Sequence, residues 1–438
     1  MGSLAVIARQ LGYKVTGCDQ DVYPPMSTYL ESQGIEIIQG YDLNKLQALK
    51  PDEIIVGNAM KRDNPIIEWM LQTKQPLVSG PAWLHEKVLR HQYVLAVAGT
   101  HGKTTTTSLL TWILQEAGLN PSFLIGGIPE NFKESSRYTG GRYFVIEADE
   151  YDTAFFDKRS KFVHYCPDTV ILNNLEFDHA DIFRDVADIQ KQFHHLLKIM
   201  PQKAYVISNG GDVNLQQVLQ QGCYSQTVLF GPRAEWDYRL LEPDASVFEV
   251  LHQNKVVVKV HWSMMGEHNV MNAIAAIAAA HTVGVAPTQA SKALESFKGI
   301  KRRLEVRGRV KDITVYDDFA HHPTAIIETI KALRGRLKNQ GRIIAVMEPR
   351  SNTMKMGVHN KTLAPALALA DSVFLYAPAN LGWDVKGCCL GYEAITVMSE
   401  FDEMLSAIVK QSQSGDHVLV MSNGGFNGIH QKLLDALV

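Results

Sequence analysis

Residues 93–107 read Tyr-Val-Leu-Ala-Val-Ala-Gly-Thr-His-Gly-Lys-Thr-Thr-Thr-Thr, and the rest of the chain is organised around this stretch. Its apolar part, Tyr93–Ala98, has the length and the β-branched content of a buried strand. A helical pattern of apolar residues then runs from Leu109 to Ala117 and ends at Gly118. A strand, a glycine turn and a helix start form the setting of a phosphate loop, in which the new helix points free N–H groups at an anion.

The predicted loop contains the candidate nucleotide-binding residues Gly99, Thr100, His101, Gly102, Lys103, Thr104 and Thr105. The two glycines let the backbone approach a phosphate, Lys103 can reach terminal phosphates, and Thr104 places a hydroxyl where Mg²⁺ would bind. Val97 stands where the strict Gly-x-x-x-x-Gly-Lys-Thr pattern has its first glycine. Even so, Gly-Lys-Thr-Thr in this setting favours nucleotide binding over an ordinary strand–helix turn with a surface lysine.

The composition limits the class of protein. A chain of 438 residues is too long for one core, so two to three domains are expected. A net charge of −3 without a basic block argues against nucleic acid as a partner. Five cysteines without a Cys-x-x-Cys pair suit a reducing cytoplasm. There is no signal peptide and no apolar run of membrane-spanning length, so we expect a cytoplasmic protein that does not contact a membrane.

Two further predicted strands end in polar residues that could bind a metal. One apolar strand runs into Glu147, Asp149 and Glu150, and a carboxylate beside a phosphate loop commonly binds Mg²⁺. Glu147 is the better metal candidate, whereas Asp149 or Glu150 alone is expected to belong to a solvated acidic loop. The segment Thr169–Asp181 repeats the pattern and places His179 between acids. That imidazole is a metal ligand, a catalytic base or only a neighbour of a helix cap.

The remaining patterns predict an α/β protein. The first 90 residues alternate helical and strand patterns, which is typical of a parallel sheet with helices on its faces. Such a unit normally begins with a strand and a glycine-rich turn, so we expect that its first strand is missing from this sequence. Tyr238–Trp262 predicts a small antiparallel hairpin with its turn at Gln253-Asn254, and Asn269 is the expected cap of the following helix. A third alternating unit follows the linker Lys301–Arg303.

Together these motifs resemble those of the Mur ligase family, the ATP-dependent amide ligases of peptidoglycan synthesis. The resemblance covers nearly the whole chain. It is carried by Gly-Thr-His-Gly-Lys-Thr-Thr at 99–105, Glu-Ala-Asp-Glu at 147–150, Asn-Leu-Glu-Phe-Asp-His at 174–179, Gly-Glu-His-Asn-Val-Met-Asn at 266–272, Arg-Arg-Leu-Glu at 302–305 and Asp-Asp-Phe-Ala-His-His-Pro at 317–323.

The resemblance implies three domains, each built on a mostly parallel sheet with flanking helices. They are a UDP-sugar domain at 1–90, a central ATP-binding domain at 91–300 with the small hairpin, and a C-terminal domain at 301–438 that closes over both. It also implies ATP and Mg²⁺ as cofactors. In this arrangement Lys103 holds the β- and γ-phosphates, Thr104 and Glu147 bind one Mg²⁺, and His179 binds a second.

The resemblance further assigns residues to the nucleotide and the amine substrate. His268 and Asn269 would lie along the adenine, and Asp318 would hold the ribose. Arg302 and Arg303 would approach the phosphates from the linker, with Arg303 in the catalytic step. His321 and Arg350 would grip the incoming amine substrate, helped by Asn352 and Lys355. A carbamylated lysine, present in some family members, is not expected here.

The segments 151–160, 348–357 and 422–426 resemble those of members that attach a tripeptide to UDP-N-acetylmuramate. Arg350 can offer a fork to a carboxylate, and Asn352 and Lys355 add more polar reach than one alanine could use. The expected partners are therefore UDP-N-acetylmuramate and L-alanyl-γ-D-glutamyl-meso-diaminopimelate, bound by a monomer. Two alternatives stay open: a ligase for free L-alanine, and a phosphate-loop ATPase that acts as a conformational switch.

Overall fold

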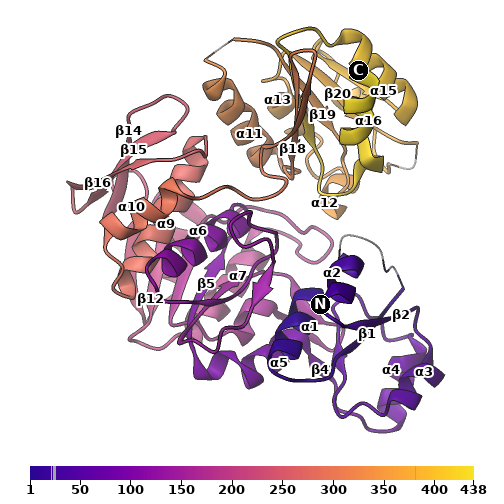
Figure 1. Ribbon diagram of the computed structural model, residues 1–438, viewed down its shortest axis with the longest axis vertical. Helices are drawn as coiled ribbons and strands as arrows, with labels where there is room; N and C mark the ends of the chain where they lie inside the picture. The colour runs from indigo at the N-terminus through magenta and orange to yellow at the C-terminus, as the bar shows by residue number, and fades with distance from the viewer. Residues whose placement is uncertain (21, 23–25, 339, 380) are drawn as a thin grey trace.

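The structure is a computed structural model, which describes residues 1–20, 22, 26–338, 340–379 and 381–438. The chain forms three lobes that follow one another in sequence, indigo, magenta to orange, and orange to yellow in Figure 1. We call them the N-terminal lobe (residues 1–91), the central lobe (93–300) and the C-terminal lobe (301–438). Within the described ranges, each helix is too short or too polar to cross a membrane. The predicted α/β class is confirmed.

The N-terminal lobe alternates helices and parallel strands, as predicted. Its elements are α1 (Gly2–Gln10), β1 (Thr16–Asp19), α2 (Met26–Ser32), β2 (Glu36–Gln39), α3 (Leu43–Leu49), β3 (Ile55–Val56), α4 (Pro65–Gln72), β4 (Val78–Ser79), α5 (Gly80–Lys87) and a 3₁₀ turn η1 (Leu89–His91). The expectation of one sheet is wrong for the described residues, because β1 pairs with β2 and β3 pairs with β4 in two separate sheets. Each pair has its own apolar cluster, around Ile35 and around Ile67 respectively.

The central lobe is built on a sheet of ten described strands in the order β16-β15-β14-β13-β12-β11-β5-β8-β6-β7. Its elements are β5 (Tyr93–Ala98), α6 (Lys103–Glu116), β6 (Ser122–Leu124), β7 (Ser136–Arg137), β8 (Tyr143–Glu147), β9 (Asp152–Ala154), β10 (Asp157–Ser160), η2 (Lys161–His164), β11 (Thr169–Leu172), α7 (Val186–Lys198), β12 (Tyr205–Asn209), α8 (Val213–Gln220), β13 (Gln226–Phe230), β14 (Trp236–Leu240), β15 (Val247–His252), β16 (Lys255–His261), α9 (Glu267–Thr282) and α10 (Pro287–Glu295). Strand β5 runs parallel to both neighbours, β8 and β11. The three predicted polar strand ends therefore lie side by side.

Apolar side chains cover both faces of this sheet. On one face, Leu109, Ile113 and Leu114 of α6 are fully buried against the alanine-rich helix α9. On the other face, α7 and α8 pack together with Ile7 of α1 and Trp83 of α5. Full burial of one such aliphatic side chain contributes about 1.5–3 kcal/mol, so this double-sided core holds the strand ends rigidly in place.

Two local predictions for the central lobe need correction. The turn at Gln253-Asn254 is confirmed, with φ of 52° and 63°, but the hairpin is part of a longer antiparallel edge, β14-β15-β16, on the main sheet. Asn269 is not the helix cap. Gly266, with φ of 87°, occupies that position. Asn269 is the third residue of α9, and its Nδ2 donates to the Met265 carbonyl at 2.8 Å.

The C-terminal lobe has a six-stranded sheet in the order β17-β18-β22-β19-β20-β21. Its elements are β17 (Glu305–Val310), β18 (Ile313–Asp318), α11 (Pro323–Arg336), β19 (Ile343–Met347), α12 (Asn352–Lys355), α13 (Leu363–Leu367), β20 (Ser372–Tyr376), α14 (Val385–Cys388), β21 (Ile395–Met398), α15 (Phe401–Gln411), β22 (His417–Met421), η3 (Phe426–Gly428) and α16 (Ile429–Leu437). Strand β17 was not predicted. It is an antiparallel edge strand with a register shift before Gly308, and this irregularity hides its alternating pattern.

Candidate active site

The loop between β5 and α6 has the conformation of a phosphate-binding turn. Gly99 and Gly102 have φ of 146° and 76°, so both lie in the region that favours glycine. A Cβ on Gly102 would lie 2.5 Å from Asn272 Oδ1 and 2.6 Å from Asn173 Nδ2. The close approach of these two amides is therefore possible only because position 102 has no side chain.

Three asparagine side chains hold the loop in shape. Asn174 Oδ1 accepts a 2.7 Å hydrogen bond from the His101 N–H, and Asn173 Nδ2 donates to the His101 carbonyl at 3.0 Å. Asn272 Oδ1 accepts from Thr106 Oγ1 at 3.0 Å and from Asn173 Nδ2 at 2.8 Å. Asn272 had no predicted role, although it belongs to the 266–272 motif. These hydrogen bonds fix the shape of the loop and tie it to the start of α9.

Lys103 lies over the loop and is paired with carboxylates. Its Nζ donates to the Gly99 carbonyl at 2.6 Å and to Glu150 Oε2 at 2.8 Å, and it lies 3.7 Å from Asp149 Oδ1. Burial acts to lower the pKa of Lys103, but the charges of Glu150 and Asp149 outweigh it and raise the pKa overall. The ammonium is therefore charged, and the Gly99 carbonyl and these carboxylates hold it over the loop.

The expectation that Glu150 belongs to a solvated loop is wrong. Glu150 is 1% exposed, because Lys103 and His179 satisfy its charge: His179 Nε2 lies 3.1 Å from Glu150 Oε1. Burial acts to lower the pKa of His179, yet the hydrogen bond and charge of Glu150 raise it overall. One potential ligand atom each from Asp149, Glu150 and His179 lies within 4.8 Å of the others, as a metal-binding group requires.

Thr104 and Glu147 meet beside the loop, as predicted for a magnesium site. Thr104 Oγ1 donates to Glu147 Oε1 at 3.1 Å, and the Gly126 N–H donates to Glu147 Oε2 at 2.7 Å. Burial raises the pKa of Glu147, so a cation beside this carboxylate would compensate its charge. The atoms that Thr104 and Glu147 offer to a metal ion are all oxygen, which is the ligand type that Mg²⁺ prefers. The residues present therefore fit Mg²⁺.

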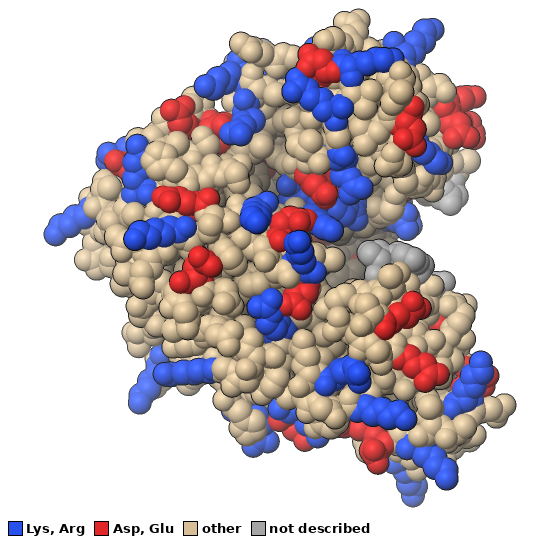
Figure 2. Space-filling view, in the orientation of Figure 1, with Lys and Arg blue, Asp and Glu red and all other residues tan. Residues whose placement is uncertain are grey.

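The C-terminal lobe docks onto the segment that follows β11. Thr353 Oγ1 donates to Asp178 Oδ1 at 2.8 Å, and Asn352 Nδ2 donates to Asp181 Oδ2 at 2.9 Å. Asn352, which is expected to bind substrate, thus contacts the central lobe while remaining exposed to solvent. Figure 2 shows basic and acidic side chains side by side around the hollow where these lobes meet.

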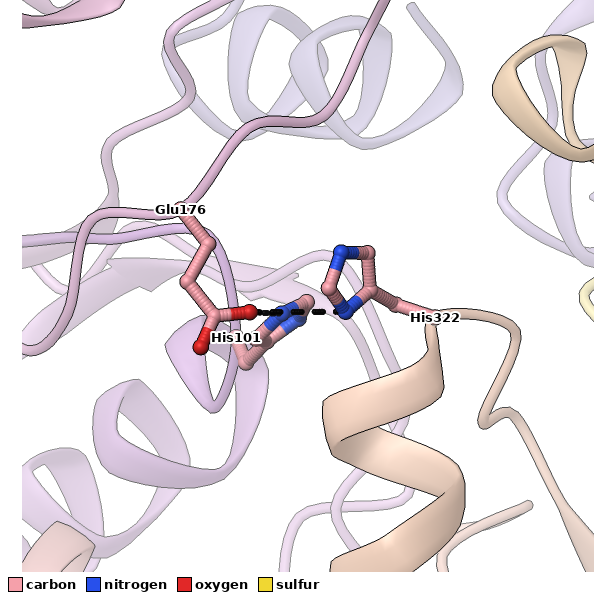
Figure 3. A group of neighbouring side chains, drawn as sticks. All are labelled: His101, Glu176 and His322. Carbon is pink, nitrogen blue, oxygen red and sulfur yellow. Dashed lines mark hydrogen bonds and ion pairs between the residues drawn. The ribbon is translucent and has the colours of Figure 1, made fainter. Parts of the chain in front are cut away.

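A second contact between the lobes joins the phosphate loop to the start of α11. His101 Nε2 lies 3.1 Å from Glu176 Oε2, and His322 Nδ1 lies 3.4 Å from the same oxygen (Figure 3). The Thr324 hydroxyl also donates to this oxygen, at 2.7 Å. Neither Glu176 nor His322 was a predicted site residue, although Glu176 belongs to the 174–179 motif and His322 to the 317–323 motif.

The linker residues lie within the C-terminal lobe. Arg302 Nη2 donates to the carbonyl oxygens of Ser422 and Gly424 at 2.6 and 2.7 Å, so its guanidinium is used inside this lobe. The Arg303 guanidinium lies 5.2 Å from the centre of the Phe319 ring. Asp318 is 4% exposed and accepts from the backbone N–H groups of Leu304 and Ala320, both at 2.8 Å. Asp318 thereby shapes the linker.

The remaining predicted binding residues are spread over both lobes. His268 Nδ1 lies 3.9 Å from Glu328 Oε2 of α11, and burial together with the charge of Arg303 lowers the His268 pKa to about 4. His321 Nδ1 is 2.9 Å from the Phe319 carbonyl. Arg350 is half-exposed, 3.8 Å from Glu348, and Lys355 is exposed on α12.

Comparison with known proteins agrees with this architecture. Three family models match: the Mur ligase family catalytic domain at residues 1–92, the Mur ligase middle domain at 97–280, and the Mur ligase glutamate ligase domain at 302–424. The chain is 56% identical over 440 aligned residues to the UDP-N-acetylmuramate–L-alanyl-γ-D-glutamyl-meso-2,6-diaminoheptandioate ligase of Escherichia coli K12, covering 100% of this chain and 96% of that one.

Two further matches are a solved structure of a peptide ligase and the sequence of an L-alanine ligase. A crystal structure of a murein peptide ligase from Psychrobacter arcticus matches with 45% identity and a TM-score of 0.77, covering 100% of this chain and 96% of the other. The UDP-N-acetylmuramate–L-alanine ligase of Syntrophomonas wolfei is 30% identical, covering 100% of this chain and 95% of that protein. The three matched models and these full-length identities show that the chain belongs to the Mur ligase family.

Proposed function

We propose that this chain is an ATP-dependent ligase that joins UDP-N-acetylmuramate to L-alanyl-γ-D-glutamyl-meso-diaminopimelate, a reaction of peptidoglycan recycling. The observation that carries the proposal is the 56% full-length identity to the E. coli ligase named for these substrates. Identity to an L-alanine ligase is 30%, so the tripeptide is favoured as the amine substrate.

The chemistry accounts for the groups at the sheet edge. A carboxylate is a poor acyl donor because its oxygen cannot leave, so the lactyl carboxylate of the sugar nucleotide attacks the γ-phosphorus of ATP and ADP departs. The α-amine of the peptide then attacks the acyl carbon, loses a proton and displaces phosphate. Both steps concentrate negative charge, and preorganised cations are the usual means of stabilising it.

Several residues of this chain would stabilise the negative charge that develops in these two steps. Lys103 supplies a fixed positive charge at the loop, and the N–H groups at the start of α6 face an anion held there. Thr104 with Glu147, and His179 with its acidic neighbours, would hold Mg²⁺, which supplies Lewis-acid stabilisation of the transferring phosphoryl group when it is bound. Arg303 would add a charge from the linker.

Exclusion of water is the second requirement, because water competes with the amine for an acyl phosphate. The contacts of Thr353 and Asn352 with the 178–181 segment bring the C-terminal lobe against the metal-binding edge. Arg350 and Lys355 flank this contact segment in the sequence and are exposed, so they would be available to the distal carboxylates of a peptide.

The test is a reaction of purified protein with UDP-N-acetylmuramate, ATP and Mg²⁺, with either the tripeptide or L-alanine as amine. We expect a product with the mass of the UDP-muramoyl tripeptide and a higher kcat/KM for the tripeptide. A preference for L-alanine would assign the de novo reaction instead. Phosphate release that needs neither acceptor nor amine would indicate a conformational ATPase.

A further inference from the structure

Three side chains from separate segments converge where the phosphate loop meets the C-terminal lobe: His101, Glu176 and His322. Figure 3 shows the two imidazole rings and the carboxylate directed toward one another. His322 is 7% exposed, and His101 and Glu176 are partly buried. The proposed ligation uses the backbone around His101 but leaves these three polar groups without a chemical role.

Their spacing matches the ligand spacing of a small metal ion. Bonds of about 2.0–2.2 Å in tetrahedral geometry place neighbouring ligand atoms about 3.3–3.6 Å apart. Glu176 Oε2 lies 3.1 Å from His101 Nε2 and 3.4 Å from His322 Nδ1. All three ligand atoms lie within 4.8 Å of one another, so small rotations of the rings suffice to surround an ion.

One contact in the cluster is unfavourable without a cation. His322 Nδ1 lies 3.3 Å from the Thr324 backbone nitrogen at the start of α11, and in the tautomer that accepts this hydrogen bond Nδ1 carries no hydrogen. It therefore faces Glu176 Oε2 as one acceptor facing another. Since this nitrogen has a single lone pair, a cation bound between the two atoms would replace the 3.3 Å hydrogen bond from the Thr324 N–H and would turn the repulsion between the two acceptors into attraction.

We propose that His101, Glu176 and His322 form a binding site for a transition-metal cation of the Zn²⁺ class, separate from the magnesium-binding edge. Two imidazoles and one carboxylate suit zinc, whereas Mg²⁺ prefers sites richer in oxygen, such as Thr104 with Glu147. Three protein ligands leave a fourth position for water or an anion. The bound ion links the phosphate loop to the start of α11 and opposes separation of the two lobes.

The test uses metal-free protein without nucleotide or sugar, so its outcome does not depend on the proposed ligation. Zn²⁺ binding is measured by calorimetry, and Co²⁺ binding by the visible absorption of the ion in a low-symmetry site. His322→Asn removes the imidazole but keeps a good helix cap, and Glu176→Gln keeps the shape of the side chain. We expect each to weaken the tight site at least about tenfold, since even lost outer-shell partners cost that much.

Two variants serve as controls. The first is His359→Asn: the ring centre of His359 is 4.5 Å from that of His322, but His359 is not one of the proposed ligands. The second is His179→Asn, which disrupts the Asp149–Glu150–His179 group. Both should retain the tight site within about twofold. The proposal is overturned by the absence of tight binding in the wild type, by unchanged affinity in both Glu176→Gln and His322→Asn, or by loss of the tight site in His179→Asn alone.

Discussion

The hydroxyl of Thr353, in the C-terminal lobe, is inserted into the turn of the central lobe that carries His179. It donates to Asp178 Oδ1 at 2.8 Å and accepts from the Ala180 N–H at 3.3 Å. His179 itself has φ of 56°, and its N–H donates to Asp178 Oδ1 at 2.7 Å. Docking of the C-terminal lobe is thereby coupled to the position of the His179 imidazole.

Thr353→Val is expected to lower kcat/KM about tenfold, because the buried Asp178 carboxylate loses one of these two donors and a hydrogen bond to a charged group contributes about 1.5–3 kcal/mol. Thr353→Ser keeps the hydroxyl and should retain most of the activity. Steady-state kinetics with Mg²⁺ varied should locate the loss in the metal dependence. Retained activity in Thr353→Val together with a loss in Thr353→Ser would show that packing of the methyl group, not the hydrogen bond, is what matters.

Lys103→Ala should lower the rate of ligation by about 10²-fold or more while the fold stays intact, because a preorganised charge at the transferring phosphoryl group is removed. The matched control is Lys410→Ala, an exposed lysine on α15. Turnover at saturating substrate and circular dichroism check the prediction. Near wild-type turnover of folded Lys103→Ala would remove this residue from the catalytic site.

Gly102→Ala tests how closely the amides approach the loop. The new Cβ would meet Asn272 and Asn173 at 2.5 and 2.6 Å, in addition to the strain of φ at 76°. Gly118 has a similar φ of 78° with open space around its Cβ position, so Gly118→Ala isolates the backbone strain, about 1–2 kcal/mol.

Chemical denaturation should therefore show a larger loss of unfolding free energy for Gly102→Ala than for Gly118→Ala. ATP binding, measured by calorimetry, should be lost only in Gly102→Ala. Equal losses in the two variants would mean that the loop can shift to accommodate the methyl group.

Glu176 should make stability depend on pH. Burial acts to raise its pKa, but the hydrogen bond and charge of His101 lower it to about 2. Because the folded-state pKa is depressed, this stability is present above the unfolded-state pKa of about 4.3 and is lost as pH falls toward 2.

Denaturation with a chelator present should show wild type more stable than Glu176→Gln at neutral pH, with the difference shrinking below about pH 4.3. A difference that stays constant over that range would mean that the Glu176 charge does not contribute to the contact between the lobes.

Lys355→Ala should raise KM for the tripeptide about two- to fivefold, which is the worth of an exposed ion pair, and leave KM for ATP unchanged. Lys361→Ala, another exposed lysine of the same lobe, is the control. If Lys355→Ala leaves peptide kinetics unaltered, this side chain only covers the lobe surface.

The sequence by itself determined the phosphate loop and the edge of the central sheet. Tyr93–Ala98 is an apolar run followed by glycines, and such local patterns specify a strand and a turn without help from distant residues. Because parallel strands end at one edge, the polar ends after β5, β8 and β11 had to come together if those strands were neighbours. The meeting of Thr104 with Glu147 follows from that logic.

Only the tertiary structure decided which polar residues are buried and which lobes they join. Glu150 resembles a solvated acid in sequence, yet Lys103 and His179 enclose it. Glu176 and His322 are 146 positions apart in the sequence, and Asp178 and Thr353 are 175 positions apart. Local propensity and periodicity carry no information about such pairs, because their energies depend on how separately folded sheets pack against each other.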